Sequence, residues 1–258
     1  MRFSIFFHLG SLAFPVAALR AERVNCDANF SADPDINVAE ILSALQNATN
    51  SRIATYPTSS TQDHTSYVYS DWQSFSQVSA VHFIADMDID CDGVDWNCTG
   101  NSDGYPLTSF GALDAREVPW FVLPESLMNI NDTFFQPNSL GAIICNGTMF
   151  YAIFGDTNGG DPEVIGEGSL LLGQTCFPND AIDGNNGHEG RDVACKFTRV
   201  PERYVANLIQ DIVFGGVVPD GVQNNTIDTM TLKKLGDQQV FMLQQELGLG
   251  DSSCGGQP

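Results

Sequence analysis

The sequence predicts a mainly β (α+β) fold, with a few peripheral helices near the two ends of the chain. Through its middle, apolar residues come in short runs or alternate with polar ones, the period-2 pattern of β-strands. The spacing of an amphipathic helix appears instead at residues 35–47 and 226–248. Neither a Pro/Ser-rich linker nor an internal repeat divides the chain, so we expect one domain over residues 22–258.

The first eighteen residues have the composition of a secretory signal peptide. Arg2 is followed by an apolar stretch that is too short to span a membrane and that ends in the small residues Val16, Ala17 and Ala18. We expect cleavage after residue 18, with cleavage after Ala21 as the alternative. The mature protein should therefore be secreted and extracellular.

The N-terminal helix is expected over residues 35–47. Asn37 and Glu40 have the spacing of a capping box, and the apolar residues that follow fall on one helical stripe: Val38, Ile41, Leu42 and Leu45. Residues 51–80 are rich in Ser, Thr and Tyr, which indicates irregular structure with short strands. The C-terminal helix, within residues 226–248, should break near Gly236.

The remaining elements are predicted from local patterns. The clearest is a β-hairpin whose two apolar runs are joined by Asn146-Gly147, the typical pair of a type I′ turn. Residues 164–176 should begin extended and end as a short helix. Strands are further expected at residues 81–93, 117–125 and 192–200.

The cysteines indicate disulfides, because an exported protein folds in an oxidising compartment. No pair forms a CxxC motif, so a zinc site has little support. Cys91 and Cys98 are the easiest pair, and Cys176 with Cys195 is a second candidate. Seven cysteines remain after signal cleavage, so at least one stays free, and Cys145 is our candidate. Six sequons also predict a glycoprotein: Asn29, Asn47, Asn97, Asn131, Asn146 and Asn224.

The charge of the chain restricts its partners. Lys and Arg number 11 against 32 Asp and Glu, which gives a formal net charge of −21. Such a surface repels nucleic acid and anionic membranes, and it attracts a cationic partner. Solubility in an acidic medium is the alternative interpretation of the charge alone. We expect a monomer with neither a nucleic-acid nor a membrane partner.

Residues 156–167 allow two interpretations. Asp156, Asn158 and Glu167 fill positions one, three and twelve of a calcium-binding EF-hand loop. However, position five is Gly160, and position six is Asp161 where the sharp turn needs Gly. The alternative is an acid–base pair, because inverting glycoside hydrolases hold two carboxyl groups about 6.5–9.5 Å apart across the sugar.

A second acidic pattern precedes this segment. In a strand, Asp86, Asp88, Asp90 and Asp92 would share one face, with neighbouring carboxylates about 6.6 Å apart. Like charges this close are unfavourable unless a cation relieves them, and Asp is disfavoured in strands. The pattern therefore favours binding of something positively charged over a merely solvated face.

Several segments together resemble the fungal chitosanases, glycoside hydrolase family 75. They are "ADMDIDCDG", "FGAL-AREVPW", "GTMFYAIFGDTNGGDPEVIGEGS" and "QTCFPND-GNNGH", and the resemblance covers about residues 81–198. It implies a secreted endo-acting hydrolase that cuts β-1,4 linkages between glucosamine residues in chitosan with inversion. It further implies a β-barrel-like core, a six-stranded barrel of the double-psi kind.

The resemblance also implies that Asp156 and Glu167 are the essential carboxyl groups. From their environments we assign Glu167 as general acid and Asp156 as general base, with the reverse assignment still open. Gly168 stands where the family pattern has Ala, and Glu163 lies close enough to compete for the Glu role. No metal and no cofactor is required. Residues expected to bind the cationic polysaccharide are Asp86, Asp88, Asp90, Asp92, Trp96, Asn158 and Glu163.

Two other functions remain alternatives at this point. One is a calcium-dependent, non-catalytic polysaccharide-binding protein that uses the loop at residues 156–167. The other is a hydrolase of neutral or acetylated glucans. The aligned acidic residues argue against the latter, because a neutral sugar has no use for four carboxylates.

Overall fold

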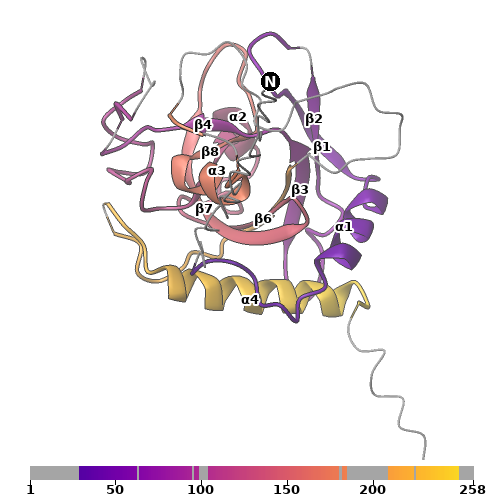
Figure 1. The fold of residues 1–258 in the computed structure, drawn as a ribbon. Helices are drawn as coiled ribbons and strands as arrows, with labels where there is room; N and C mark the ends of the chain where they lie inside the picture. Colours follow the sequence, from indigo (N-terminus) through magenta and orange to yellow (C-terminus); the bar gives the residue numbers. More distant parts are fainter. Residues whose placement is uncertain are drawn as a thin grey trace, which may run out of the picture.

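The computed structural model describes residues 29–62, 64–94, 96–98, 104–179, 182–184, 209–223 and 225–249. The predicted signal peptide, the strand at 192–200, the partner proposed for Cys176 and the sequon at Asn224 lie outside these residues. The described elements are α1 Val38–Asn47, β1 Arg52–Pro57, β2 Thr65–Tyr69, β3 Ala80–Ala85, β4 Asp88–Asp90, β5 Trp120–Pro124, α2 Glu125–Ile130, β6 Leu140–Cys145, β7 Thr148–Asn158, β8 Glu167–Ser169, α3 Leu170–Cys176, β9 Ile209–Phe214 and α4 Thr229–Glu246 (Figure 1).

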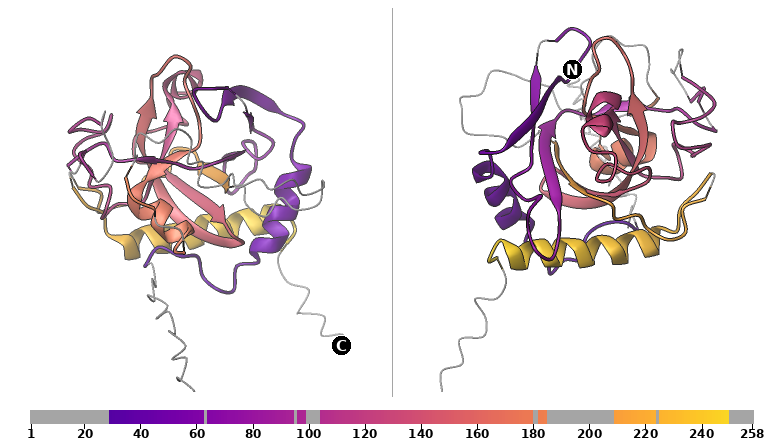
Figure 2. Two further views of the ribbon diagram at one scale, coloured as in Figure 1. Left: turned by 45° about the horizontal axis from the view of Figure 1, so that its top comes forward. Right: turned by 180° about the vertical axis from the view of Figure 1, so that it is seen from behind.

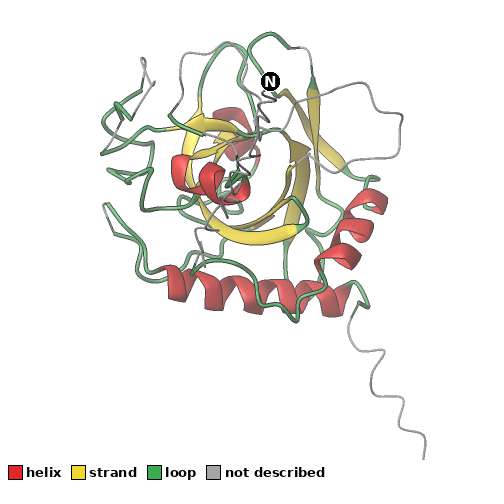
Figure 3. Ribbon diagram, in the orientation of Figure 1, coloured by secondary structure: helices red, strands yellow, loops and turns green. Residues whose placement is uncertain are grey.

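The predicted mainly β fold is confirmed: one sheet dominates the molecule, and helices lie around it (Figure 3). Its strand order is β1-β2-β3-β9-β6-β7-β5-β8-β4. β3 and β4 are separated by only two residues in the chain but lie far apart in this order, so the sheet must curl back on itself. Figure 2 shows this curled half-barrel from two further directions. The double-psi topology stays a prediction.

The hairpin β6–β7 forms the centre of the sheet. Asn146 and Gly147 have φ values of 50° and 74°, which is the left-handed conformation that a type I′ turn requires at both positions. The predicted hairpin is therefore confirmed. β7 also pairs with β5 on its other side, and its residues from Met149 to Asp156 are buried. This strand carries Asp156 to the edge of the core.

The acidic stretch predicted as one strand is divided into two. β3 pairs antiparallel with β9, whereas β4 pairs parallel with β8, and residues 86–87 between them belong to neither strand. Alternation holds from Asp88 onward, where half-buried acidic residues alternate with buried apolar ones. Asp86, only 3% exposed, lies outside this partly exposed row.

The two long helices test the predicted boundaries. Asn37 caps α1, and its Oδ1 accepts a hydrogen bond from the backbone N of Glu40 (3.2 Å), as expected. The predicted break at Gly236 is wrong, because α4 runs through it. A Cβ at Gly236 would lie 2.3 Å from the ring of Tyr151, whose hydroxyl donates to Asp237 (2.8 Å). Gly236 therefore permits close packing of α4 on β7.

The disulfides confirm one predicted pair and correct the other. Cys91 and Cys98 are bonded as expected. Cys176 is bonded to Cys145 and not to Cys195, so Cys145 is not the free thiol. The end of β6 and the end of α3 meet here, and the side chain of Asn146 donates to the carbonyl of Cys176 (2.9 Å). Among the described residues, none of the helices has the length and apolarity of a membrane span.

Asp211 is a carboxyl group buried inside the sheet. It lies on β9 between Phe83 of β3 and Ile143 of β6, is 3% exposed, and its Oδ2 has no hydrogen-bond partner in the described part of the chain. Burial raises the pKa of Asp211 to about 8. Because this value lies above that of the unfolded chain, the contribution of Asp211 to stability is full below about pH 4 and is lost as the pH rises toward 8.

We therefore expect Asp211→Asn to flatten the pH dependence of stability. The wild-type melting temperature should fall more steeply between pH 4 and pH 8 than that of the variant. The difference should reach on the order of a few kcal/mol of unfolding free energy. Thermal unfolding of both proteins at the two pH values measures it, with the exposed Asp35→Asn as control. Parallel curves for the wild type and Asp211→Asn would show that Asp211 is not protonated in the folded protein.

Candidate active site

The sheet register brings Asp156 and Glu167 to the two sides of one residue. β5 lies between β7 and β8, and Val122 on β5 is the register partner of both Asp156 and Glu167. Residues in register on neighbouring strands project to the same face. Two inter-strand spacings place the Cα atoms of Asp156 and Glu167 roughly 10 Å apart. The two predicted residues therefore share one face, with an apolar side chain between them.

Asp156 is held at one oxygen by three hydrogen-bond donors. Its Oδ1 accepts from the backbone N of Ser109 (2.8 Å), the Oγ of Ser109 (2.6 Å) and the backbone N of Thr157 (2.7 Å). Burial raises the pKa of Asp156, and these three bonds oppose that rise because they stabilise the carboxylate. The side chain is thus fixed in place with its second oxygen turned away from the three donors.

Glu167 has a different environment. The Nδ2 of Asn158 donates to its Oε2 (3.0 Å), and Asn158 is itself held by the backbone N–H groups of Gly160 and Val164, which donate to its Oδ1. Burial, followed by the charge of Asp90, raises the pKa of Glu167 to about 8, and the bond from Asn158 opposes this only in part. Glu167 therefore keeps its proton in mildly acidic and neutral solution.

Asp90 is the third carboxyl group of the cluster. Its Oδ2 accepts from the indole N–H of Trp120 (2.9 Å), and its Oδ1 accepts from the backbone N of Asp92 (2.8 Å). Burial, and then the charge of Asp156, raises the pKa of Asp90 to about 7. Carboxylate oxygens of Asp90, Asp92 and Asp156 lie within 4.8 Å of one another, the one grouping in the described residues with the spacing of metal ligands. Glu167 does not belong to this grouping, whereas the calcium-loop interpretation requires Glu167 as a ligand at position twelve.

The other predicted binding residues lie around this cluster. Asp88 is the register partner of Glu167 on β4, and Asp92 accepts a hydrogen bond from the backbone N of Tyr105 (2.8 Å). Trp96, 38% exposed, lies in the loop closed by the Cys91–Cys98 disulfide. Asp86 packs against Gly166, where an added Cβ would lie 2.9 Å from its Oδ1.

Glu163 is bonded to α2. Its carboxylate accepts from the backbone N of Ser126 (3.1 Å) and from the Ser126 hydroxyl, which also bonds to the hydroxyl of Tyr56 (2.9 Å). This network fixes the loop that precedes Glu167. It supports Glu167, and not Glu163, as the partner of Asp156 in any acid–base chemistry.

Sequence reasoning missed Ser109 and the bond from Trp120 to Asp90. Ser109 immediately precedes a segment that resembles the family, but nothing in its sequence context connects it to a residue 47 positions later. Trp120 is fully buried, and only the register of β5 places its indole next to β4. Both contacts join segments that are distant in the sequence.

Glycoside hydrolases use two carboxyl groups on one face, and here the pKa of Glu167 is raised to about 8 while three hydrogen-bond donors oppose the rise at Asp156. The comparisons with known proteins agree with this class. Residues 87–240 match the family described as "Fungal chitosanase of glycosyl hydrolase group 75", so the chain belongs to the family 75 fungal chitosanases.

Named relatives support the same family. Endo-chitosanase C of Aspergillus oryzae is 41% identical over 227 residues, which cover 86% of this chain and 55% of that protein. An endo-chitosanase of Aspergillus fumigatus is 31% identical over 183 residues, covering 65% of this chain and 72% of that protein. The chain thus spans about half the length of the first of these relatives.

The three donors to Asp156 predict the effect of Ser109→Ala. Loss of one hydrogen bond to a carboxylate should raise the pKa of Asp156, so any hydrolysis that needs the Asp156 carboxylate should show an acidic limb of its pH profile at higher pH. kcat should fall about tenfold with little change in KM. Ser109→Thr, which keeps a hydroxyl, should restore both. An unchanged acidic limb in Ser109→Ala would refute this role of Ser109.

Proposed function

We propose that the chain is a secreted endo-chitosanase that hydrolyses β-1,4 linkages between glucosamine residues with inversion of configuration. The observation that carries this proposal is the register of β7, β5 and β8, which sets Asp156 and Glu167 on either side of Val122. The estimated Cα separation of roughly 10 Å is compatible with carboxyl groups far enough apart to admit a water molecule beside the sugar, as inversion requires. Family membership supports the substrate, because the similar proteins are named endo-chitosanases.

Each carboxyl group then has a defined role. Glu167 donates its proton to the glycosidic oxygen, and the bond between that oxygen and C1 breaks. Asp156 accepts a proton from a water molecule, whose oxygen forms the new bond to C1 from the opposite face. Solvent returns the proton from Asp156 to Glu167 between turnovers. The raised pKa of Glu167 and the three donors to Asp156 support this order of roles over the reverse.

The surroundings of the pair suit an amino-sugar polymer. Asp88, Asp90 and Asp92 form a half-buried acidic row next to Glu167. Ammonium groups of chitosan would make charge-assisted hydrogen bonds there and relieve the repulsion between these carboxylates. Trp96, 38% exposed in the loop closed by the Cys91–Cys98 disulfide, would stack on a sugar ring.

The remaining parts of the proposal concern the whole protein. A signal peptide at residues 1–18 directs export, and residues 22–258 form one catalytic domain. The enzyme acts as a monomer on a cationic polysaccharide, and it needs neither a metal nor an organic cofactor. The net charge of −21 speeds the encounter with that substrate.

Asp156→Asn and Glu167→Gln test the assignment directly. Each removes the proton acceptor or donor and leaves the shape of the side chain almost unchanged, so chitosan hydrolysis should fall at least about 100-fold. Formation of reducing ends measures the activity, and circular dichroism checks the fold. Glu163→Gln, at the other candidate Glu, should cost far less. Near-normal turnover in Asp156→Asn or Glu167→Gln would contradict the proposed mechanism.

The same assay separates the two alternatives. The wild-type protein is incubated with chitosan, chitin and cellulose, with and without excess chelator. The proposal predicts cleavage of chitosan alone, at a rate that the chelator does not change. Cleavage of cellulose or chitin in preference to chitosan would favour a hydrolase of neutral glucans. Chelator-sensitive binding without cleavage would favour the calcium-dependent binding protein.

A further inference from the structure

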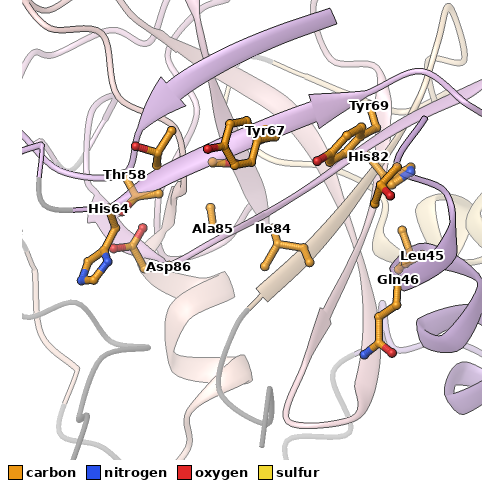
Figure 4. A pocket seen from close by; sticks show the side chains of 13 residues that line it. Leu45, Gln46, Thr58, His64, Tyr67, Tyr69, His82, Ile84, Ala85 and Asp86 are labelled. Atoms are coloured by element: carbon orange, nitrogen blue, oxygen red, sulfur yellow. The ribbon is translucent and has the colours of Figure 1, made fainter. Parts of the chain in front are cut away.

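A cavity of about 520 Å³ opens between β2 and β3, outside the carboxyl cluster (Figure 4). These strands pair in register only at Tyr69 and His82. Toward Thr65 the hairpin β1–β2 diverges from β3, so the space between them is not closed by backbone hydrogen bonds. The volume lies within the range of small-molecule binding sites, about 300–1,000 Å³.

One wall of the cavity is aromatic. Tyr67 lines it and is 40% exposed, and Tyr69 follows two residues later with ring centroids 6.5 Å apart. The guanidinium carbon of Arg52 lies 5.2 Å from the centroid of the Tyr67 ring, which fixes this ring by a cation–π contact. A ring that is held in place and yet exposed offers a flat apolar surface at little entropic cost.

The opposite end of the cavity is polar. Figure 4 shows Thr58, His64 and Asp86 gathered there, on the far side of Tyr67 from Leu45. Their hydroxyl, imidazole and carboxyl groups are the kinds of groups that orient a ligand in an otherwise apolar pocket. The carboxylate oxygens of Asp86 are themselves buried, so the exposed imidazole of His64 is the group that a ligand meets first at this end.

The polar end adjoins the proposed active site. Asp86 packs against Gly166, the residue immediately before Glu167. Asp88, two residues beyond Asp86, is the register partner of Glu167. Even a fully extended chain from Asp86 to Asp88 (about 6.6 Å) plus one inter-strand spacing (about 4.8 Å) would put the backbone at Asp86 no more than roughly 11 Å from that at Glu167. The polar end of the cavity therefore lies near Glu167.

We propose that this cavity is a remote subsite that binds a glucosamine unit of the same chitosan chain, with Tyr67 as its stacking surface and the exposed His64 at its polar end. The proposal rests on the proposed function. It assigns Tyr67 to chain binding and not to bond cleavage. Long chains, which span both sites, should gain from it, whereas short chains bound at Glu167 alone should not.

Tyr67→Ala tests this assignment, with Tyr67→Phe as the variant that keeps the ring. Phe241→Ala is the matched control, because Phe241 is an exposed aromatic residue (59%) on α4. Tyr67→Ala should raise KM for polymeric chitosan about tenfold, the loss of one stacking contact, and leave kcat unchanged. Tyr67→Phe and Phe241→Ala should behave as the wild type. For chitobiose and chitotriose, KM should not change.

An unchanged KM for polymeric chitosan in Tyr67→Ala would overturn the proposed subsite. An equal rise of KM for short and long substrates would also overturn it, because it would show a general binding defect. If the wild-type protein cleaves nothing, the proposed function is refuted, but the cavity can still be tested. Calorimetric titration with glucosamine hexamer then measures binding directly. Tyr67→Ala should then weaken hexamer binding. Equal binding of cellohexaose and glucosamine hexamer by the wild type would overturn the amino-sugar assignment.

Discussion

The site depends on one electrostatic constraint: several buried or half-buried carboxyl groups lie close together, and their hydrogen-bond donors are neutral. In the described part of the chain, the donors to Asp90, Asp156 and Glu167 are an indole, an amide, a hydroxyl and backbone N–H groups. None of these carries a charge that would offset the desolvation of a carboxylate. Without a bound cation, the cluster is therefore stable only if part of it stays protonated, which is the property that an acid catalyst needs.

The fold makes this arrangement possible by bringing four strands into register. Asp156, Val122, Glu167 and Asp88 form a row across β7, β5, β8 and β4. The disulfide between Cys145 and Cys176 joins the hairpin to the helix that follows β8, and that between Cys91 and Cys98 closes the loop after β4. The scaffold thus fixes the backbone on both sides of the carboxyl groups, so that they cannot separate to relieve their repulsion.

The sequence predicted best those features that neighbouring residues determine. The turn at Asn146-Gly147, the cap at Asn37 and the Cys91–Cys98 disulfide all depend on a few consecutive positions. The burial of Asp86, the true partner of Cys176 and the role of Gly236 beside Tyr151 depend on segments that meet only after folding. The family resemblance selected Asp156 and Glu167, but the register that places them on one face is visible only in the structure.

The protonation of Glu167 is the central claim, and a pH titration of its carboxyl carbon by ¹³C NMR measures it most directly. The resonance is assigned by its absence from the spectrum of the Glu167→Gln protein. The account predicts a titration midpoint near pH 8, because burial and the neighbouring acidic groups raise the pKa of Glu167 to about 8. A midpoint near the ordinary value for Glu, about 4.3, would contradict it.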